Sequence, residues 1–243
     1  MNLIIEQGNS ATKIAVFNHA EMVHYSVYKD FNMSDIICVL DQYPLSNGIL
    51  STVTDTNNEL IDCLKNRLKC FFFFDERMRL PIDNHYQTPE TLGKDRIAAA
   101  VGAFCLQPGK NILVIDAGTA VTYEVVTAAG IYIGGNISPG MTTRFRALNR
   151  FTKHLPLVSE KGYVPLIGSS TKKAILAGVV NGMVYEMDGF IYELRKKYPD
   201  IYVFLTGGHS FYFEKRLKNT IFAVLNLVLI GLNRILEYNV ENK

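Results

Sequence analysis

One sequence pattern occurs twice in this chain, close to half the chain length apart, and it constrains the fold more than any other feature. The first copy is LIIEQGNSATKIAVF, an apolar run followed by an acid, a glycine, a hydroxyl residue and a second apolar run. The second copy, ILVIDAGTAVTYEVV, has the same order. The acid, glycine and hydroxyl residues are Glu6, Gly8 and Ser10 in one copy and Asp116, Gly118 and Thr119 in the other. Each copy is typical of a β-hairpin, and the pair predicts a two-lobed α/β protein built from related halves.

Helical patterns fill the intervals between the strands. The alanine-rich stretch Asp95–Leu106 ends before Pro108-Gly109 and predicts a helix. A longer apolar stripe follows the hydroxyl residues Ser169-Ser170-Thr171, and Ile221–Leu236 shows the same period. Four consecutive phenylalanines, Phe71–Phe74, predict a short strand buried on both faces. This alternation of strands and helices favours the α/β class.

Composition narrows the possible partners. The chain has 243 residues, of which 48% are hydrophobic and 20% charged, and its formal net charge is +2. A charge this small argues against binding to nucleic acid or an anionic membrane. We expect no export signal or membrane span, because Glu6 interrupts the first apolar run and the longest one, Ile221–Leu232, is too short. Four cysteines without a CxxC pair suit a reduced, cytoplasmic protein.

The chemistry of the repeated hairpin suits a nucleotide triphosphate. Glycine lets backbone N–H groups approach a ligand closely, the hydroxyl groups of Ser10 and Thr119 add donors, and Lys13 adds a positive charge for phosphate. Glu6 and Asp116 are oxygen ligands suited to Mg²⁺ or a monovalent cation. A single copy is more typical of a purely structural turn, and only the repetition at half the chain length favours a phosphate site.

The segment YQTPETLGKDRIAAA is the second candidate site. Asp95 and Arg96 stand where the predicted helix begins, and a helix start stabilises anions. An ionised Asp95 could remove a proton from an alcohol during phosphoryl transfer, and Arg96 could bind a carboxylate or phosphate. The alternative is an acidic helix cap beside a solvated arginine.

Taken in order, the segments EQGNSATK, LGKDR, DAGTAVT, GGNISPGM, TKKAILAG and TGGHS resemble those of type III pantothenate kinases. These enzymes belong to the superfamily of actin-like proteins, sugar kinases and Hsp70 ATPases. The resemblance implies two actin-like, ribonuclease H-like lobes with mixed sheets flanked by helices, which we expect at residues 1–110 and 111–243. It also implies ATP-dependent phosphorylation of pantothenate, the first step of coenzyme A synthesis, with Mg²⁺ and a monovalent cation, K⁺ or NH₄⁺, in a homodimer.

The resemblance also assigns roles to individual residues. Asp95 would accept the proton of the pantothenate hydroxyl, and Asp116 would bind the monovalent cation. The ATP-binding residues would be Glu6, Gln7, Gly8, Asn9, Ser10, Ala11, Thr12, Lys13 and Thr119. Pantothenate would contact Tyr86, Gly93, Lys94, Asp95, Arg96 and Thr171. Gly207 and Gly208 match a turn near the adenosine.

One departure from the family pattern concerns the divalent metal. The first motif usually begins with aspartate, whereas this chain has Glu6, which is one methylene longer. Mg²⁺ requires near-ideal octahedral geometry. The longer Glu6 side chain therefore weakens the assignment of the metal site more than it weakens the assignment of the fold. Two rival functions stay open: a kinase for another small alcohol or acid, and a nucleotide-binding regulator without activity. The small residues Ala174, Gly178 and Gly182 share a helix face that packs closely either within the subunit or against a second one.

Overall fold

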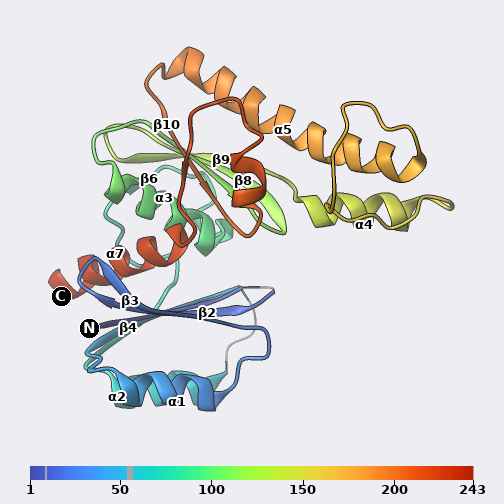
Figure 1. Cartoon of the computed structure of the whole chain (residues 1–243). Coiled ribbons are helices and arrows are strands. Elements are labelled where there is room, and N and C mark those ends of the chain that lie inside the picture. Colours follow the sequence, from blue (N-terminus) through green and yellow to red (C-terminus); the bar gives the residue numbers. More distant parts are fainter. Residues whose placement is uncertain (9, 54–56, 243) are drawn as a thin grey trace. The chain divides into compact units, whose positions relative to one another are not determined.

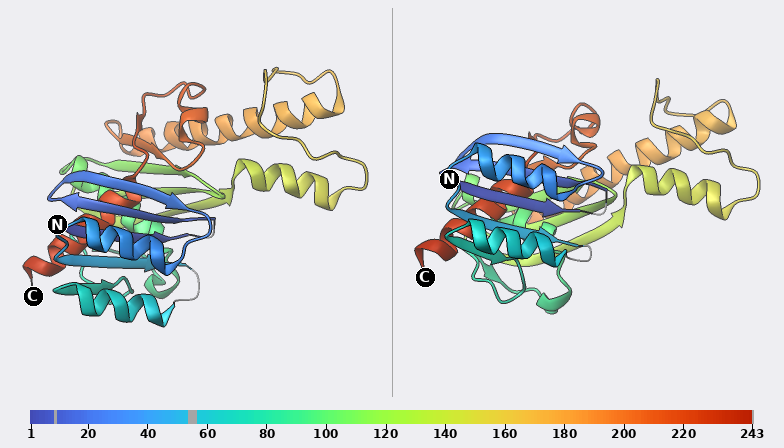
Figure 2. Two further views of the ribbon diagram at one scale, coloured as in Figure 1. Left: turned by 60° about the horizontal axis from the view of Figure 1, so that its bottom comes forward. Right: turned by 90° about the horizontal axis from the view of Figure 1, so that it is seen from below.

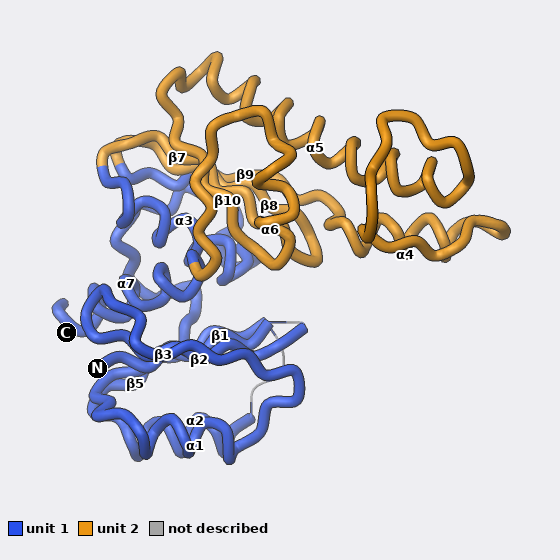
Figure 3. The backbone as a smooth tube through the Cα atoms, in the orientation of Figure 1, with its two compact units in different colours: residues 1–108, 130–132, 227–243 blue, residues 109–129, 133–226 orange. Residues whose placement is uncertain are grey.

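The computed structural model describes residues 1–8, 10–53 and 57–242 (Figure 1). The chain forms two compact units, coloured separately in Figure 3. The first contains residues 1–108, 130–132 and 227–243, and the second contains residues 109–129 and 133–226. The second unit is thus inserted before the last helix of the first. The functional lobes expected at 1–110 and 111–243 stay a prediction.

A five-stranded mixed sheet organises the first unit, in the order β3-β2-β1-β4-β5. Strand β1 is antiparallel to β2 and parallel to β4. The strands are β1 (Asn2–Gln7), β2 (Thr12–Asn18), β3 (Glu21–Tyr28), β4 (Asn47–Thr52) and β5 (Cys70–Phe73). Helices α1 (Met33–Gln42) and α2 (Asn58–Arg67) cover one face (Figures 1 and 2). Asn32 and Asn57 cap these two helices with their side chains, as expected of asparagine at a helix start.

Helices α3 (Lys94–Leu106) and α7 (Leu227–Glu241) cross within the first unit at two glycines. A Cβ atom on Gly231 would lie 1.8 Å from the carbonyl oxygen of Ala98, and one on Gly102 would lie 2.4 Å from that of Leu227. The helices therefore approach closely enough to exclude any side chain at the crossing. Two short elements, β6 (Asp83–Asn84) and the 3₁₀ turn η1 (Pro89–Thr91), precede α3.

The second sheet has the order β11-β10-β7-β8-β9-β6. Its central strand β7 is antiparallel to β8 and parallel to β10, which is the arrangement of β1 with β2 and β4. The elements of this region are β7 (Ile112–Ala117), β8 (Ala120–Val126), β9 (Ile131–Pro139), α4 (Met141–Phe151), α5 (Thr171–Lys197), β10 (Tyr202–Thr206), α6 (Ser210–Glu214) and β11 (Phe222–Ala223). The repeated hairpin of the sequence is thus confirmed as a repeat of sheet topology.

The long helix α5 confirms the predicted apolar stripe. Ser170 caps it by accepting a hydrogen bond from the backbone N–H of Lys173. Its apolar side chains, among them Val180, Met183 and Met187, pack on β7, β8 and β10 in the core of the second unit. Among the described helices, α5 is long and apolar enough to cross a membrane, but half of its apolar window is buried here, as in a core helix.

Two of the small residues on α5 do not pack against the rest of the described chain, although Gly168 lies directly against the backbone of Ala174. A Cβ atom added to Gly178 or to Gly182 would find nothing within 4 Å among the described residues, apart from the helix's own neighbouring backbone. Ala174 and Gly178 are exposed to solvent. Close packing within the subunit, one of the two expected explanations, is therefore wrong for Gly178 and Gly182 in the part of the chain that the structure describes.

Two local predictions need correction. The helix expected over Ile221–Leu236 begins only at Leu227, because Phe222 and Ala223 pair with Phe204 and Leu205 of β10 as strand β11. The phenylalanine run does form a strand, but β5 lies at the edge of its sheet, so Phe73 is 36% exposed while Phe74 is buried. In both cases the position of a strand in its sheet, which local sequence does not encode, decides the outcome.

Candidate active site

The two repeated turns share two features, although the first is one residue longer. In the first, the Gly8 N–H donates to the carbonyl oxygen of Ala11 at 3.1 Å, and in the second the Gly118 N–H donates to that of Ala120 at 3.0 Å. A Cβ atom on either glycine would lie 3.3 Å from the carboxylate of the acid two residues before it, Glu6 Oε1 or Asp116 Oδ1. Each turn therefore combines a carboxylate at the end of a central strand with a glycine that leaves the space above it open.

Glu6 is buried in the first turn and faces Lys13 across the hairpin. Their Oε2 and Nζ atoms lie 2.6 Å apart, an ion pair whose geometry is not that of an aligned hydrogen bond. Thr12 is buried, Gln7 and Ala11 are half-buried, and Ser10 is exposed. Asn9 lies outside the described residues. The turn thus presents one half-exposed ammonium and one exposed hydroxyl group, both suited to phosphate.

The second turn is covered by the segment TGGHS. Gly207 has φ +91°, and a Cβ atom there would lie 2.3 Å from Asp116 Oδ1. The His209 N–H also donates to the carbonyl oxygen of Ala117 at 3.0 Å. Gly207 therefore lets its backbone lie directly against the Asp116 carboxylate, which no side chain would permit. Thr119, at the tip of the turn, is exposed.

Asp95 lies in the first turn of α3, as predicted. It is exposed, and its Oδ1 accepts the backbone N–H of Arg96 at 2.9 Å. Gly93 is the residue before the helix, and a Cβ atom there would lie 2.7 Å from Asp95 Oδ1. The glycine leaves room for the carboxylate of the exposed Asp95 side chain.

Arg96 follows Asp95 but is 6% exposed. Its guanidinium carbon lies 5.5 Å from the centre of the Tyr86 ring, a cation–π distance. Tyr86 in turn contacts Tyr132 with ring centres 6.1 Å apart. Sequence analysis identified Tyr86 and Arg96 but not the fully buried Tyr132, which stands between two isoleucines and looks like an ordinary strand residue.

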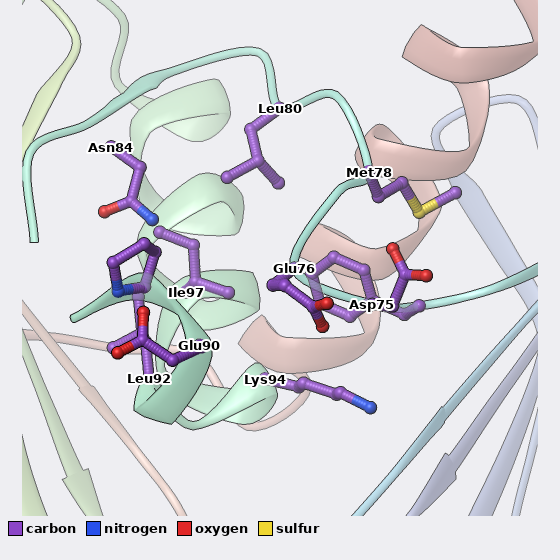
Figure 4. A pocket seen from close by; sticks show the side chains of 11 residues that line it. Asp75, Glu76, Met78, Leu80, Asn84, Glu90, Leu92, Lys94 and Ile97 are labelled. Atoms are coloured by element: carbon purple, nitrogen blue, oxygen red, sulfur yellow. The ribbon is translucent and has the colours of Figure 1, made fainter.

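A pocket lies beside this site in the first unit (Figure 4). Of the predicted substrate residues, Lys94 lines it, and its ammonium lies 4.9 Å from the centre of the Phe73 ring. The pocket also contains three carboxylates, from Asp75, Glu76 and Glu90. A hydrogen bond from Arg77 holds the pKa of Asp75 below its ordinary value, so this residue stays negative near neutral pH.

Thr171 is the first residue of α5 in the second unit, and it is exposed. Figure 2 shows α4, residues 152–170 and the start of α5 standing away from the sheet of that unit. We call residues 141–185 the arm. The structure thus places Asp116 and Thr119 on the sheet of the second unit and Thr171 on its arm, whereas Glu6–Lys13 and Gly93–Arg96 belong to the first unit.

The residues fit a cation held partly by a nucleotide better than one held by protein alone. No cluster of three acidic, histidine or cysteine side chains occurs among the described residues. However, Gln7 Oε1 is buried without a hydrogen-bond partner among those residues. Mg²⁺ is often bound by one or two carboxylates together with substrate phosphates. Glu6 and Gln7 in the first unit, and Asp116 in the second, each offer oxygens suited to such a cation.

The structure also contains a polar cluster that the sequence did not reveal. Tyr123, Ser138 and Arg144 all contact the carboxylate of Glu186 in the second unit. The four residues are far apart in the sequence and belong to no shared motif. Tyr123 lies in the second copy of the repeat and Ser138 in GGNISPGM, but neither segment indicated a contact with Glu186.

Comparison with known proteins agrees with the fold and with the order of the motifs. The structure resembles a conserved Campylobacter jejuni protein described as a member of the Baf family of transcriptional activators (TM-score 0.61, 22% identity, 98% of this chain and 99% of that one). It also resembles the inorganic polyphosphate/ATP-glucomannokinase of Arthrobacter sp. strain KM (TM-score 0.51, 9% identity, 98% and 100%). At these identities the likeness concerns the fold alone, and it confirms the prediction of two actin-like lobes with mixed sheets flanked by helices.

The sequence comparisons are more specific. The type III pantothenate kinase of Phocaeicola vulgatus is 48% identical over 239 residues, covering 98% of this chain and 99% of that protein. The type III pantothenate kinase of Christiangramia forsetii is 43% identical over 98% of this chain. The sequence model of the family matches residues 2–193, which include both repeated turns and the LGKDR segment. The chain therefore belongs to the type III pantothenate kinase family.

Proposed function

We propose that this protein transfers the terminal phosphoryl group of ATP to the primary alcohol of pantothenate, forming ADP and 4'-phosphopantothenate in the first step of coenzyme A synthesis. The observation that carries this proposal is family membership over nearly the whole chain, together with the duplicated carboxylate–glycine turn. Phosphoryl transfer mainly requires positioning and stabilisation of charge, and the exposed hydroxyl groups of Ser10 and Thr119 and the ammonium group of Lys13 suit that purpose.

The ATP phosphates are assigned to the turn Glu6–Lys13 and to Thr119. The Lys13 ammonium would neutralise phosphate charge, while its ion pair with Glu6 fixes its direction. The exposed hydroxyl groups of Ser10 and Thr119 would donate to phosphate oxygens. Gly207, pressed against Asp116, supports placing the TGGHS turn near the same nucleotide.

Pantothenate is assigned to the start of α3. The exposed Asp95 carboxylate would accept the proton of the attacking alcohol while the bond to the phosphorus atom forms. Arg96, buried and stacked on Tyr86, would pair with the carboxylate of pantothenate. Gly93 and Lys94 complete this subsite, and Thr171 would contribute from the arm.

Two cations are part of the proposal. Mg²⁺ would enter with ATP, with Glu6 as its nearest carboxylate, directly or through water. A monovalent cation, K⁺ or NH₄⁺, is assigned to Asp116. When bound, these ions offset the negative charge that accumulates on the phosphates during transfer.

The proposal also includes a homodimer that is formed through the arm. Phe151, Tyr163, Leu166 and Ile167 of the arm are between 74% and 86% exposed. The open face of α5, with Gly178 and Gly182, continues the same surface. Apolar exposure of this extent is typical of a subunit contact. Thr171 begins α5 within the arm, so dimerisation would bring it to the partner's surface. Reaction in the cytoplasm, without nucleic acid or membrane, completes the proposal.

A coupled ADP-release assay with pantothenate, run with K⁺, with NH₄⁺ and with Na⁺ alone, tests the proposal. We expect turnover that depends on Mg²⁺ and falls in Na⁺ alone. Full rate in Na⁺ would refute the cation site at Asp116. A panel of sugars and small hydroxy acids distinguishes a kinase of other specificity, and ATP binding without transfer to any acceptor would favour a regulator.

A further inference from the structure

The Glu186 cluster joins four elements of the second unit through one carboxylate. The Tyr123 hydroxyl of β8 donates to Oε1 of Glu186 at 2.8 Å, and the Ser138 hydroxyl of β9 donates to the same oxygen at 2.5 Å. Arg144 of α4 donates from Nη2 to Oε2 at 2.5 Å. The side chains of Arg144 and Glu186 are only 22% and 23% exposed. The carboxylate is therefore almost fully occupied by donors and largely shielded from water.

Near neutral pH, Glu186 stays ionised and Tyr123 keeps its proton. Burial alone would raise the pKa of Glu186, but the hydrogen bonds from Ser138, Arg144 and Tyr123 outweigh it, so the pKa lies below its ordinary value. Burial and the neighbouring carboxylate raise the pKa of Tyr123, which keeps its proton and remains a donor. An ion pair shielded in this way often stabilises a fold no better than apolar side chains of similar size. What the Arg144–Glu186 ion pair adds is a fixed direction and geometry of the two side chains.

Arg144 transmits that geometry to the turn between β9 and α4. Its Nε donates to the carbonyl oxygen of Pro139 at 2.7 Å, and its backbone N–H donates to that of Gly140 at 2.9 Å. The guanidinium group thus holds the Pro139-Gly140 peptide between the Glu186 carboxylate and the first turn of α4.

Gly140 in turn lies directly on the second carboxylate–glycine turn. Its N–H donates to the carbonyl oxygen of Thr119 at 3.0 Å, and the Thr143 hydroxyl donates to the same oxygen at 2.8 Å. A Cβ atom on Gly140 would lie 2.3 Å from the carbonyl oxygen of Gly118. The position of the Gly118-Thr119 peptide is therefore set from outside the hairpin.

We propose that Glu186 is a positioning residue for the nucleotide: through Arg144 and Gly140 it fixes the turn Asp116–Thr119 in the conformation that binds ATP phosphate and the monovalent cation. This inference rests on the proposed role of that turn. Glu186 touches neither ligand itself. Its effect is expected to be selective, because the pantothenate residues Gly93–Arg96 belong to the first unit. Thr171, the remaining pantothenate residue on α5, makes none of the contacts to the Glu186 carboxylate.

Glu186→Gln tests the inference, because it removes the charge while keeping the shape. We expect the KM for ATP and the K⁺ concentration for half-maximal rate to rise about tenfold, in the range of 10–100-fold typical when an outer partner of a ligand site is lost. The KM for pantothenate should stay within twofold. Glu193→Gln is the matched control, because Glu193 lies on the same helix in an exposed ion pair with Lys196, and its kinetics should equal those of the wild type.

Thermal unfolding and a second variant separate positioning from folding. If Glu186→Gln does not fold, Ser138→Ala decides, since it removes one donor and leaves the Arg144–Glu186 pair; we expect a two- to fivefold rise in the KM for ATP alone. Equal rises for ATP and pantothenate, or a lower melting temperature with unchanged kinetics, would overturn the inference. Thr119→Ala is run in parallel: if it too leaves ATP binding unchanged, the proposed role of the turn fails instead.

Discussion

Glu6 and Asp116 occupy corresponding places in the two turns, but the Glu6 side chain is one methylene group longer and makes different contacts. The longer Glu6 side chain reaches Lys13 at 2.6 Å, whereas Asp116 lies beneath the backbone of Gly207. Glu6 thus has two roles in the proposal: it orients the ammonium group of Lys13, and it offers an oxygen ligand to Mg²⁺. The departure from the family's aspartate is compatible with the local geometry, because the hairpin register places Lys13 directly opposite.

Substitution of Glu6 separates charge from length. We expect Glu6→Asp, which keeps the carboxylate, to retain turnover within about tenfold. Glu6→Gln should lose roughly 10–100-fold and require more Mg²⁺ for half-maximal rate, because a metal-binding oxygen loses its charge. Initial rates across a Mg²⁺ titration provide the measurement. Equal Mg²⁺ requirements for the wild type and Glu6→Gln would exclude Glu6 from the metal.

Asp95 is the single side chain whose loss should stop the chemistry without affecting nucleotide binding. We expect Asp95→Asn to lower kcat by about 10²–10⁴-fold, the usual contribution of a general base, while ATP affinity measured by calorimetry stays the same. Asp62→Asn, at an exposed position on α2, controls for the loss of one surface charge. Turnover of Asp95→Asn within tenfold of the wild type would remove Asp95 from the role of base.

At the scale of elements, the crossing of α3 and α7 depends on two glycines. Gly231→Ala would place a methyl group 1.8 Å from the Ala98 carbonyl oxygen, so we expect a loss of at least about 1–3 kcal/mol in the free energy of unfolding. Gly189→Ala on α5 is the control: its Cβ atom meets nothing within 4 Å among the described residues, and the change should be neutral or stabilise by up to about 1 kcal/mol. Urea unfolding measures both.

The attachment of α4 and α5 to strands β8 and β9 through Glu186 should depend on pH. Its pKa is lowered on folding, so the unfolded chain binds more protons in acid and the contribution of Glu186 to stability is lost as pH falls. We expect the wild type and Glu186→Gln to differ in unfolding free energy at pH 7 and to converge below the ordinary pKa of 4.5. A difference that stayed constant down to pH 3 would contradict this expectation.

Sequence predicted the elements whose signals are local. The acid–glycine turns, the hydroxyl cap at Ser170 and the start of α3 follow from residues close together in the chain. The strand at Phe222-Ala223 and the exposure of Phe73 depend on which strand lies alongside, and the cluster around Glu186 joins residues from four elements. Such long-range pairings produce no periodic pattern of residues, so they could not be predicted from the sequence.

At the scale of the whole molecule, the arm is expected to make the protein dimeric. Replacing Leu166 and Ile167 together by Glu introduces charge at two side chains that are 74% and 82% exposed. The monomer should keep its fold, because neither side chain is buried, but light scattering should show dissociation. Val27→Glu, on a half-exposed residue of β3, is the control. A double variant that stays dimeric, or a wild type that is monomeric and active, would defeat the proposal.

The helix that completes the first unit is synthesised after the whole of the second. Asn233 of α7 hydrogen-bonds Asn2 at 2.9 Å and the carbonyl oxygen of His19 at 2.9 Å. Strand β1 and the turn after β2 can therefore form these contacts only once α7 has been synthesised. On the ribosome, residues 109–226 can collapse as they emerge, whereas the preceding segment remains unfinished and exposes the surface that α7 will cover. Nascent chains stalled before residue 227 should therefore be the species that chaperones hold and proteases cut.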